Sequence, residues 1–187
     1  MIFPAAYNCL SQNEFVFEEY KLVPIRYEDR LAIMKWRNEQ MYHLRQDKPL
    51  TEKSQENYFN GTVAKLLDQE KPNQILFSYL KNDKCIGYGG LVHIDWIDKN
   101  AEISFIMNTD LEENHFHFHW STYLKMIESL AFEELSFHKL YVYAFDLRPH
   151  LYKVLLDSNY FRDAILKEHC CFDNQFIDVI IYSKLKT

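Results

Sequence analysis

The sequence lacks the features that mark several classes of protein. Its basic residues are scattered without a Lys/Arg run, and the formal net charge is −6 at pH 7. Binding along a nucleic acid needs clustered positive charge, so we expect no nucleic-acid partner. No apolar run approaches the length that spans a bilayer, and residues 1–10 lack the basic start of a signal peptide. We therefore expect neither a membrane span nor a secretion signal.

Cysteine is sparse as well, with four residues and no C-x-x-C pair. Cys170 and Cys171 are adjacent, and neighbouring side chains of an extended chain point to opposite faces, which argues against a shared metal. A catalytic cysteine would need a local signature that this sequence does not contain. We expect reduced, structural thiols in a cytoplasmic protein, and no metal site.

The amino-acid composition is that of a globular domain. Hydrophobic residues make up 48%, aromatic residues 16% and charged residues 26% of the chain. A chain of 187 residues is long enough to bury a core, and a second domain is not expected. We therefore treat residues 1–187 as a single domain, with residues 1–19 as a polar and aromatic lead-in.

Periodicity and turn residues predict alternating strands and helices. Thr51 is a good N-cap for one helix, and the pairs at residues 82–83 and 173–174 are typical of hairpin turns. Residues 117–135 carry apolar side chains at helical spacing. The expected strands cover residues 20–25, 75–80, 85–93, 101–107, 139–145, 164–169 and 177–185, and the expected helices cover residues 28–42, 51–69, 117–135 and 150–159.

The order of these elements is β-α-α-β-β-β-α-β-α-β-β. Three consecutive strands form an antiparallel meander, and a strand–helix–strand crossover follows it. This order predicts an α/β (α+β) fold with a mixed sheet and helices on its faces.

Local segments add a resemblance to a known family. The segments that carry it are KLVPIR at 21–26, DR at 29–30, WRN at 36–38, CIGYGGL at 85–91, NAEISFI at 100–106, YF at 160–161, KEH at 167–169 and FIDV at 176–179. In order and spacing they resemble the GNAT N-acetyltransferase superfamily, in the branch of ribosomal-protein and amino-sugar N-acetyltransferases. The resemblance covers essentially the whole chain. It implies a mostly antiparallel sheet of about seven strands, with a parallel pair splayed at one end and helices on both faces.

The resemblance also implies an acetyl-CoA cosubstrate, held where the two parallel strands part. Its pantetheine arm would pair with the backbone of Phe105, Ile106 and Met107. Phe145, at the end of the neighbouring strand, is a further candidate contact. A strand edge offers unpaired N–H and C=O groups to an amide-bearing ligand. The alternative is that these residues are simply core strand.

The family's glycine-containing pyrophosphate turn corresponds to residues 114–120, which hold no glycine. In one account the helix N-terminus still binds pyrophosphate through its amides and dipole, with histidines in place of the usual basic residue. In the other, bulky side chains block the approach of the ligand to the backbone. We favour the first, and the spacing of the histidines does not match a metal site on a helix. The candidate residues are His115, Phe116, His117, Phe118, His119 and Trp120.

Acetyl transfer needs a group that accepts the amine proton, and an acid can protonate the departing thiolate. Glu102 is our candidate base, because family members often place a carboxylate on this strand and burial would raise its pKa. His93 is the competing base. Tyr152 is the candidate acid, although it lies one helical turn before the family's usual tyrosine position. Packing or surface roles are the alternatives for all three.

Four residues are candidates for binding the acceptor amine: Trp36, Arg37, Asn38 and Tyr88. An arginine can bind a phosphate and a tryptophan can stack on a ring, which suits a nucleotide-linked amino sugar for surface polysaccharide. A protein or peptide N-terminus is the second choice. The rival hypothesis is a non-catalytic GNAT-fold module that binds coenzyme A or a protein partner. The acyl chain length and the oligomeric state, a homodimer included, stay open.

Overall fold

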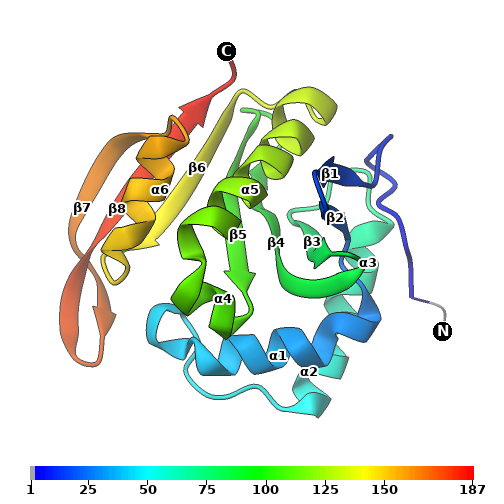
Figure 1. Ribbon diagram of the computed structural model, residues 1–187, viewed down its shortest axis with the longest axis horizontal. Coiled ribbons are helices and arrows are strands. Elements are labelled where there is room, and N and C mark those ends of the chain that lie inside the picture. Colours follow the sequence, from blue (N-terminus) through cyan, green and yellow to red (C-terminus); the bar gives the residue numbers. More distant parts are fainter. Residues whose placement is uncertain (1–2) are drawn as a thin grey trace.

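The computed structural model describes residues 3–187, so the first two residues of the expected lead-in lie outside the described range. Eight strands form one sheet in the order β1-β2-β3-β4-β5-β6-β8-β7 (Figure 1). The strands are β1 (Phe15–Phe17), β2 (Tyr20–Pro24), β3 (Ile75–Lys81), β4 (Lys84–Asp95), β5 (Asn100–Met107), β6 (Lys139–Phe145), β7 (Phe161–Phe172) and β8 (Gln175–Leu185). The α-helices are α1 (Arg30–Glu39), α2 (Glu52–Tyr58), α3 (Ala64–Leu67), α4 (Thr109–Asn114), α5 (Phe116–Glu128) and α6 (Pro149–Asp157).

The mixed sheet predicted from the sequence is confirmed. Strands β3 to β5 form the expected antiparallel meander, and β2 pairs antiparallel with β3. Strands β5 and β6 are parallel, and β7 and β8 form the closing hairpin. The additional strand is β1, which comes from the lead-in and pairs with β2. Its Phe15 is buried, so burial of an aromatic side chain draws the lead-in onto the edge of the sheet.

Two expected helices are divided. Thr51 caps α2 as expected, accepting a hydrogen bond from the Ser54 N–H at 3.2 Å. A π-helical turn at Phe59–Val63 then separates α2 from α3, and a second one at Ser129–Glu134 follows α5.

The largest correction concerns residues 114–120, which the sequence predicts to be a turn leading into the long helix. The chain is already helical there, because α4 begins directly after β5 and breaks only at His115. The side chain of Asn108 caps α4 by accepting from the Asp110 N–H at 3.1 Å. Acidic residues in the first turn of α4 suit the helix dipole. These capping signals have no apolar periodicity, so the search for apolar residues at helical spacing did not predict α4.

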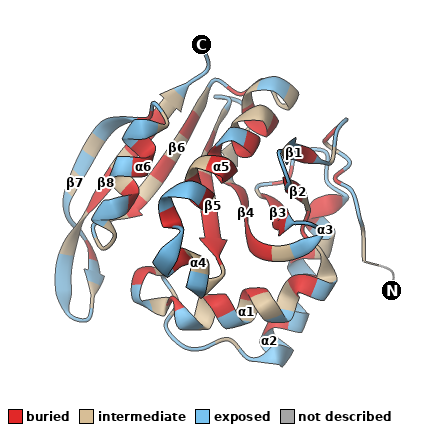
Figure 2. Ribbon diagram, in the orientation of Figure 1, coloured by how far each residue is buried: buried red, intermediate tan, exposed pale blue. Residues whose placement is uncertain are grey.

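Helices α5 and α1 lie on opposite faces of the sheet. Phe105 of β5 stacks on Tyr123 of α5, with ring centroids 3.9 Å apart. Gly89 of β4 lies opposite Phe105 on that face, and an added Cβ would come within 2.1 Å of the Ser104 carbonyl oxygen. Neighbouring side chains of a strand alternate between faces, so Tyr88 faces α1. Figure 2 shows the buried residues concentrated on α5 and the central strands.

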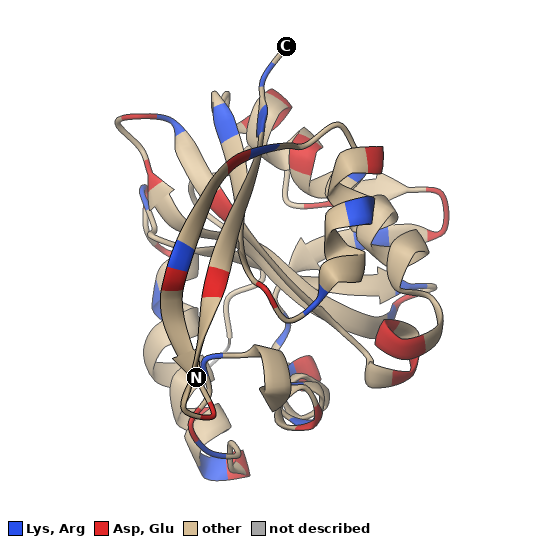
Figure 3. Cartoon of the chain, turned by 90° about the vertical axis from the view of Figure 1, so that its left-hand side faces the viewer, with Lys and Arg blue, Asp and Glu red and all other residues tan. Residues whose placement is uncertain are grey.

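The β7–β8 hairpin is the most exposed part of the sheet (Figure 2). Acidic and basic side chains are interspersed along it and over the neighbouring surface (Figure 3). Cys170 is buried and Cys171 exposed, as the alternation of a strand requires. No helix within residues 3–187 has the length and apolarity needed to cross a membrane.

Candidate active site

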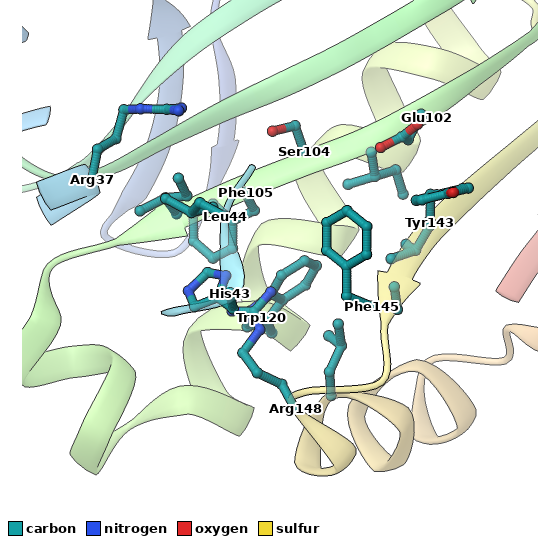
Figure 4. Close-up of a pocket in the computed structure, with 15 residues that line it drawn as sticks. Arg37, His43, Leu44, Glu102, Ser104, Phe105, Trp120, Tyr143, Phe145 and Arg148 are labelled. Atoms are coloured by element: carbon teal, nitrogen blue, oxygen red, sulfur yellow. The ribbon is translucent and has the colours of Figure 1, made fainter. Parts of the chain in front are cut away.

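The two parallel strands separate after a short paired stretch. Strands β5 and β6 pair only from Asn100 to Glu102 on β5 and from Lys139 to Tyr141 on β6. Beyond Glu102 they diverge, and a cavity of about 160 Å³ lies between them, which we call the cleft. Figure 4 shows Glu102 at the paired end and Arg148 beside Trp120 farther along.

The backbone N–H and C=O groups of successive β5 residues point alternately toward β4 and toward the cleft. The Asn108 N–H donates to the Ile86 carbonyl at 2.8 Å, which continues the ladder to β4. In an antiparallel pair every second residue faces the same partner, so Ile106 also directs its backbone to β4, whereas Phe105 and Met107 direct theirs into the cleft. The Met107 carbonyl already accepts from the Gln40 amide at 2.7 Å. Phe105 is therefore the best placed of the three candidates to pair with an extended ligand.

Glu102 and His93, named from the sequence as competing bases, are in contact. His93 Nδ1 lies 2.8 Å from Glu102 Oε2. Burial raises the pKa of Glu102, and the hydrogen bond from His93 opposes that rise. Glu102 lines the cleft, whereas His93 is exposed and has a φ of 48° beside a bulge in β4. The pair thus links the cleft to solvent through one imidazole.

Tyr152, the candidate acid, faces away from the cleft. Its hydroxyl donates to Asp146 Oδ1 at 2.7 Å, and its ring stacks on Tyr182 of β8 at 5.5 Å. Burial, followed by this hydrogen bond, raises the pKa of Tyr152. Leu151, one residue earlier, lines the cleft. Successive residues of a helix are separated by about 100°, so one position decides which side chain reaches the cleft.

The segment from His115 to Trp120 divides among four environments. Phe116 and His117 line a second cavity of about 600 Å³, which we call the mouth cavity, between α4, α5 and α6. Trp120 lines the cleft. Phe118 and His119 pack against Tyr20 of β2, and His115 is exposed. The helix start therefore offers Phe116 and His117, and no glycine, to a ligand in the mouth cavity.

The mouth cavity has mixed charge. His117, His150 and Lys153 supply basic groups, and Glu112 and Glu113 supply acidic ones. His117 pairs with Asp157 at 2.8 Å across the α5–α6 junction.

An ion pair that sequence reasoning missed separates the mouth cavity from the cleft. Arg148 Nη1 donates to Glu112 Oε1 at 3.0 Å, and the two side chains are only 13% and 5% exposed. Glu112 lines the mouth cavity and Arg148 lines the cleft. The other Glu112 oxygen is buried without a hydrogen-bond partner among residues 3–187. The partners are 36 positions apart, so no local signal reveals the pair.

His43 lines the cleft next to this ion pair. Burial, together with the nearby charge of Arg148, lowers the pKa of His43 from 6.5 to about 3. The imidazole is therefore neutral at physiological pH. Ser104 and Tyr143 also line the cleft and were not singled out from the sequence.

A third cavity, of about 280 Å³, lies between α1, α2 and β4, and we call it the α1–α2 cavity. Of the four acceptor candidates, Arg37 and Tyr88 line it. Arg37 also lines the cleft, so it connects the two spaces. Trp36 is buried in the core, and Asn38 holds the following loop by bonds to both backbone groups of Leu50. Neither of these two lines the cleft or the α1–α2 cavity.

The cleft has the form that a thioester arm requires, because one strand edge is open beside a cavity whose paired end holds a carboxylate. A family model described as an acetyltransferase (GNAT) domain matches residues 22–181 of the chain. The chain belongs to the GNAT acetyltransferase family. As a GNAT enzyme it uses acetyl-CoA as acyl donor and an amine as acceptor, and the residues that line the cleft fit such a donor.

Solved structures share the GNAT fold at low sequence identity. The spermidine N-acetyltransferase of Vibrio cholerae in complex with CoA and spermine superposes with a TM-score of 0.77 at 17% identity, over 91% of this chain and 97% of that one. A dodecameric structure of the Vibrio cholerae spermidine N-acetyltransferase in an intermediate state gives a TM-score of 0.74 at 17% identity, over 91% and 95%. At this identity the likeness establishes the fold.

A further Vibrio cholerae structure, a spermidine/spermine N-acetyltransferase in complex with manganese ions, gives a TM-score of 0.73 at 17% identity, over 90% and 94% of the two chains. In the GNAT chain described here, residues 3–187 contain no group of three or more His, Cys, Asp or Glu side chains placed to hold a metal ion.

Proposed function

We propose that the protein transfers an acetyl group to a primary amine with Glu102 as the general base and His93 as its proton relay. The observation that carries this proposal is the contact between a partly buried carboxylate in the cleft and an exposed imidazole outside it. A carboxylate whose pKa is raised accepts a proton more readily near neutral pH than an ordinary glutamate.

In this proposal acetyl-CoA supplies the activated acyl group, and the protein residues manage the proton. Glu102 accepts a proton from the amine as its nitrogen bonds to the acyl carbon and the carbon–sulfur bond breaks. His93 takes that proton from Glu102 and releases it to solvent, since its ring is exposed. Backbone N–H groups of β5 that face the cleft are positioned to stabilise the developing oxyanion. Solvent protonates the departing thiolate, because Tyr152 is turned away from the cleft.

For the acceptor we propose a small molecule, with a nucleotide-linked amino sugar as first choice and a peptide N-terminus as second. The α1–α2 cavity, on the face of the sheet opposite α5, supports a small acceptor because it is enclosed by two helices and one strand. The exposed ring of Tyr58 at its rim, rather than the buried Trp36, is available to stack on a sugar or base.

The test compares Glu102→Gln with the wild-type protein in a free-thiol release assay with acetyl-CoA and a panel of primary amines. We expect kcat to fall by about 10²- to 10⁴-fold, as for loss of a general base. The thermal shift with acetyl-CoA should be unchanged, because the variant keeps the shape of the cleft. Tyr152→Phe should reduce kcat less than about tenfold.

Two outcomes would contradict the proposal. Equal losses in Glu102→Gln and Tyr152→Phe would restore the tyrosine as the acid. Binding of acetyl-CoA without thiol release on any amine would instead favour the non-catalytic module.

A further inference from the structure

Arg37 is a half-buried cation that has no acidic partner among residues 3–187. Its Nε donates to Gln46 Oε1 at 3.1 Å and its Nη1 donates to the Tyr88 hydroxyl at 2.7 Å, and both acceptors are uncharged. Within residues 3–187 no carboxylate oxygen lies within 4.0 Å of this guanidinium, and Nη2 has no hydrogen-bond acceptor. The protein thus holds Nε and Nη1 of the guanidinium, and Nη2 is left for a ligand.

Two other partly buried arginines, Arg26 and Arg148, are paired with carboxylates, and Arg37 is not. Arg26 makes two hydrogen bonds to the carboxylate of Asp29, at 2.7 and 2.8 Å, and Arg148 is paired with Glu112. Withdrawing an unpaired cation from water costs free energy. An anionic group of a ligand would offset that cost, and a guanidinium binds carboxylate and phosphate groups with two parallel hydrogen bonds.

The α1–α2 cavity itself contains no negative charge. Its lining is aliphatic, aromatic and uncharged polar apart from Arg37, and no described Asp or Glu takes part. A polyamine would place further positive charge beside the guanidinium without a carboxylate to bind it, which is unfavourable at this distance. The Vibrio cholerae neighbours with the same fold are named for spermidine, but the α1–α2 cavity of the present protein has no carboxylate in its described lining to bind a polycation.

We propose that the acceptor carries an oxyanion, a carboxylate or a phosphate, in addition to its amine, and that Arg37 binds this oxyanion. The inference rests on the proposed acetyl transfer. Arg37 lines both the α1–α2 cavity and the cleft that holds Glu102. An acceptor bound in the α1–α2 cavity through its oxyanion therefore presents its amine toward the carboxylate at the paired end of β5 and β6. Arg37 is a specificity-determining residue in this scheme.

The first experiment measures binding without catalysis. Inorganic phosphate is titrated into the protein without acetyl-CoA, and melting is followed at constant ionic strength with chloride as the matched salt. We expect phosphate to raise the Tm of the wild-type protein but not that of Arg37→Gln, with Arg37→Lys between them, because lysine keeps the charge but lacks the paired donors. An equal rise in the wild-type protein and Arg37→Gln would overturn the assignment.

The second experiment measures specificity with matched amines. Glucosamine is compared with glucosamine 6-phosphate, an amino acid with its amide, and spermidine is included as the polycation. We expect the oxyanion-bearing member of at least one pair to have the higher kcat/KM. Arg37→Gln should reduce that preference by about 10- to 100-fold, as for loss of hydrogen bonds to a charged group.

Each result separates this inference from the proposed function. Thiol release on spermidine above all other amines, or an unchanged preference in Arg37→Gln, overturns the oxyanion site and leaves acetyl transfer standing. Absence of thiol release on every amine overturns the proposed function, and the phosphate titration still decides whether Arg37 binds an oxyanion. If Arg37→Gln fails to fold, the comparison of wild-type protein with Arg37→Lys serves the same purpose.

Discussion

Two arginines line the same cleft and have opposite environments. Arg148, at the start of α6, is paired with Glu112 across the boundary between the cleft and the mouth cavity. Among residues 3–187, the guanidinium of Arg37, on α1, makes hydrogen bonds only to the uncharged Tyr88 and Gln46. Both side chains are withdrawn from bulk water, so the difference lies in their partners rather than in their burial. The protein neutralises Arg148 with a carboxylate and leaves Arg37 available to an anionic ligand.

This difference separates a structural from a recognition role. A neutralised ion pair holds two helices in place and resists removal of either partner, because the remaining charge would be left almost buried. A cation held only by neutral groups contributes little to stability. A ligand of opposite charge can pair with it without displacing a carboxylate of the protein. The role of an arginine in this cleft therefore depends on the side chain with which it is paired, and not on residue type alone.

Removing each arginine in turn tests the comparison with the largest expected effect. Arg148→Gln should lower the free energy of unfolding by about 3–5 kcal/mol, because Glu112 loses its cation. Arg37→Gln should change it by less than about 1 kcal/mol. Urea denaturation at pH 7 measures both.

The double variant Arg148→Gln/Glu112→Gln is the matched control for the ion pair. It should recover part of the loss, since no buried charge then remains unpaired. A loss in Arg37→Gln as large as that in Arg148→Gln would show that both arginines are structural, and the comparison would fail.

The pH dependence of stability sharpens the comparison near Arg148. Burial and, secondly, the charge of Arg148 lower the pKa of His43 from 6.5 to about 3 in the folded protein. A lowered pKa means that protonation of His43 is less favourable in the folded than in the unfolded protein. The contribution of neutral His43 to folding stability is therefore complete above pH 6.5 and is lost as the pH falls toward 3. Wild-type protein should therefore lose about 2 kcal/mol from this residue between pH 7 and pH 5.

The difference between the wild-type and His43→Gln unfolding curves isolates this contribution from those of other histidines. The variant should lose less stability over the same interval. Arg148→Gln should also flatten the curve, because it removes one of the two largest causes of the shift, whereas Arg37 acts on His43 more weakly. Parallel curves for wild type and His43→Gln would show that the imidazole is not held neutral by the cleft.

The order of strands and helices was predictable because it depends on local signals. Turn residues marked both hairpins, and Asp173 and Asn174 indeed adopt positive φ values of 46° and 62°. The family resemblance also placed Glu102 and Phe105 on a strand beside the cofactor, and in the structure that strand borders the cleft. Helix α4 was missed because its signal is a capping interaction at Asn108 rather than a pattern of apolar residues.

The partners of the site residues could not be predicted, because they come from distant parts of the chain or depend on small shifts in register. Glu102 and His93 were named as alternatives, and a bulge after Val92 brings them into contact. Tyr152 was placed on the correct helix, but Asp146 and the packing of α6 on β8 turn its hydroxyl away. The pairing of Arg148 with Glu112 follows from the meeting of α4 and α6, which no local pattern encodes.

The smallest expected effect comes from the hydroxyl that orients Arg37. Tyr88→Phe removes one acceptor of the guanidinium and should cost about 0.5–1.5 kcal/mol of stability, as for a single hydrogen bond. Because the charge of Arg37 remains, the variant should raise KM for an oxyanion-bearing acceptor several-fold and leave kcat nearly unchanged. A titration of acceptor at saturating acetyl-CoA separates the two constants. A large fall in kcat with constant KM would instead place the Tyr88 hydroxyl at the reacting atoms, and the neutral partner of Arg37 would then be a proton donor rather than a support.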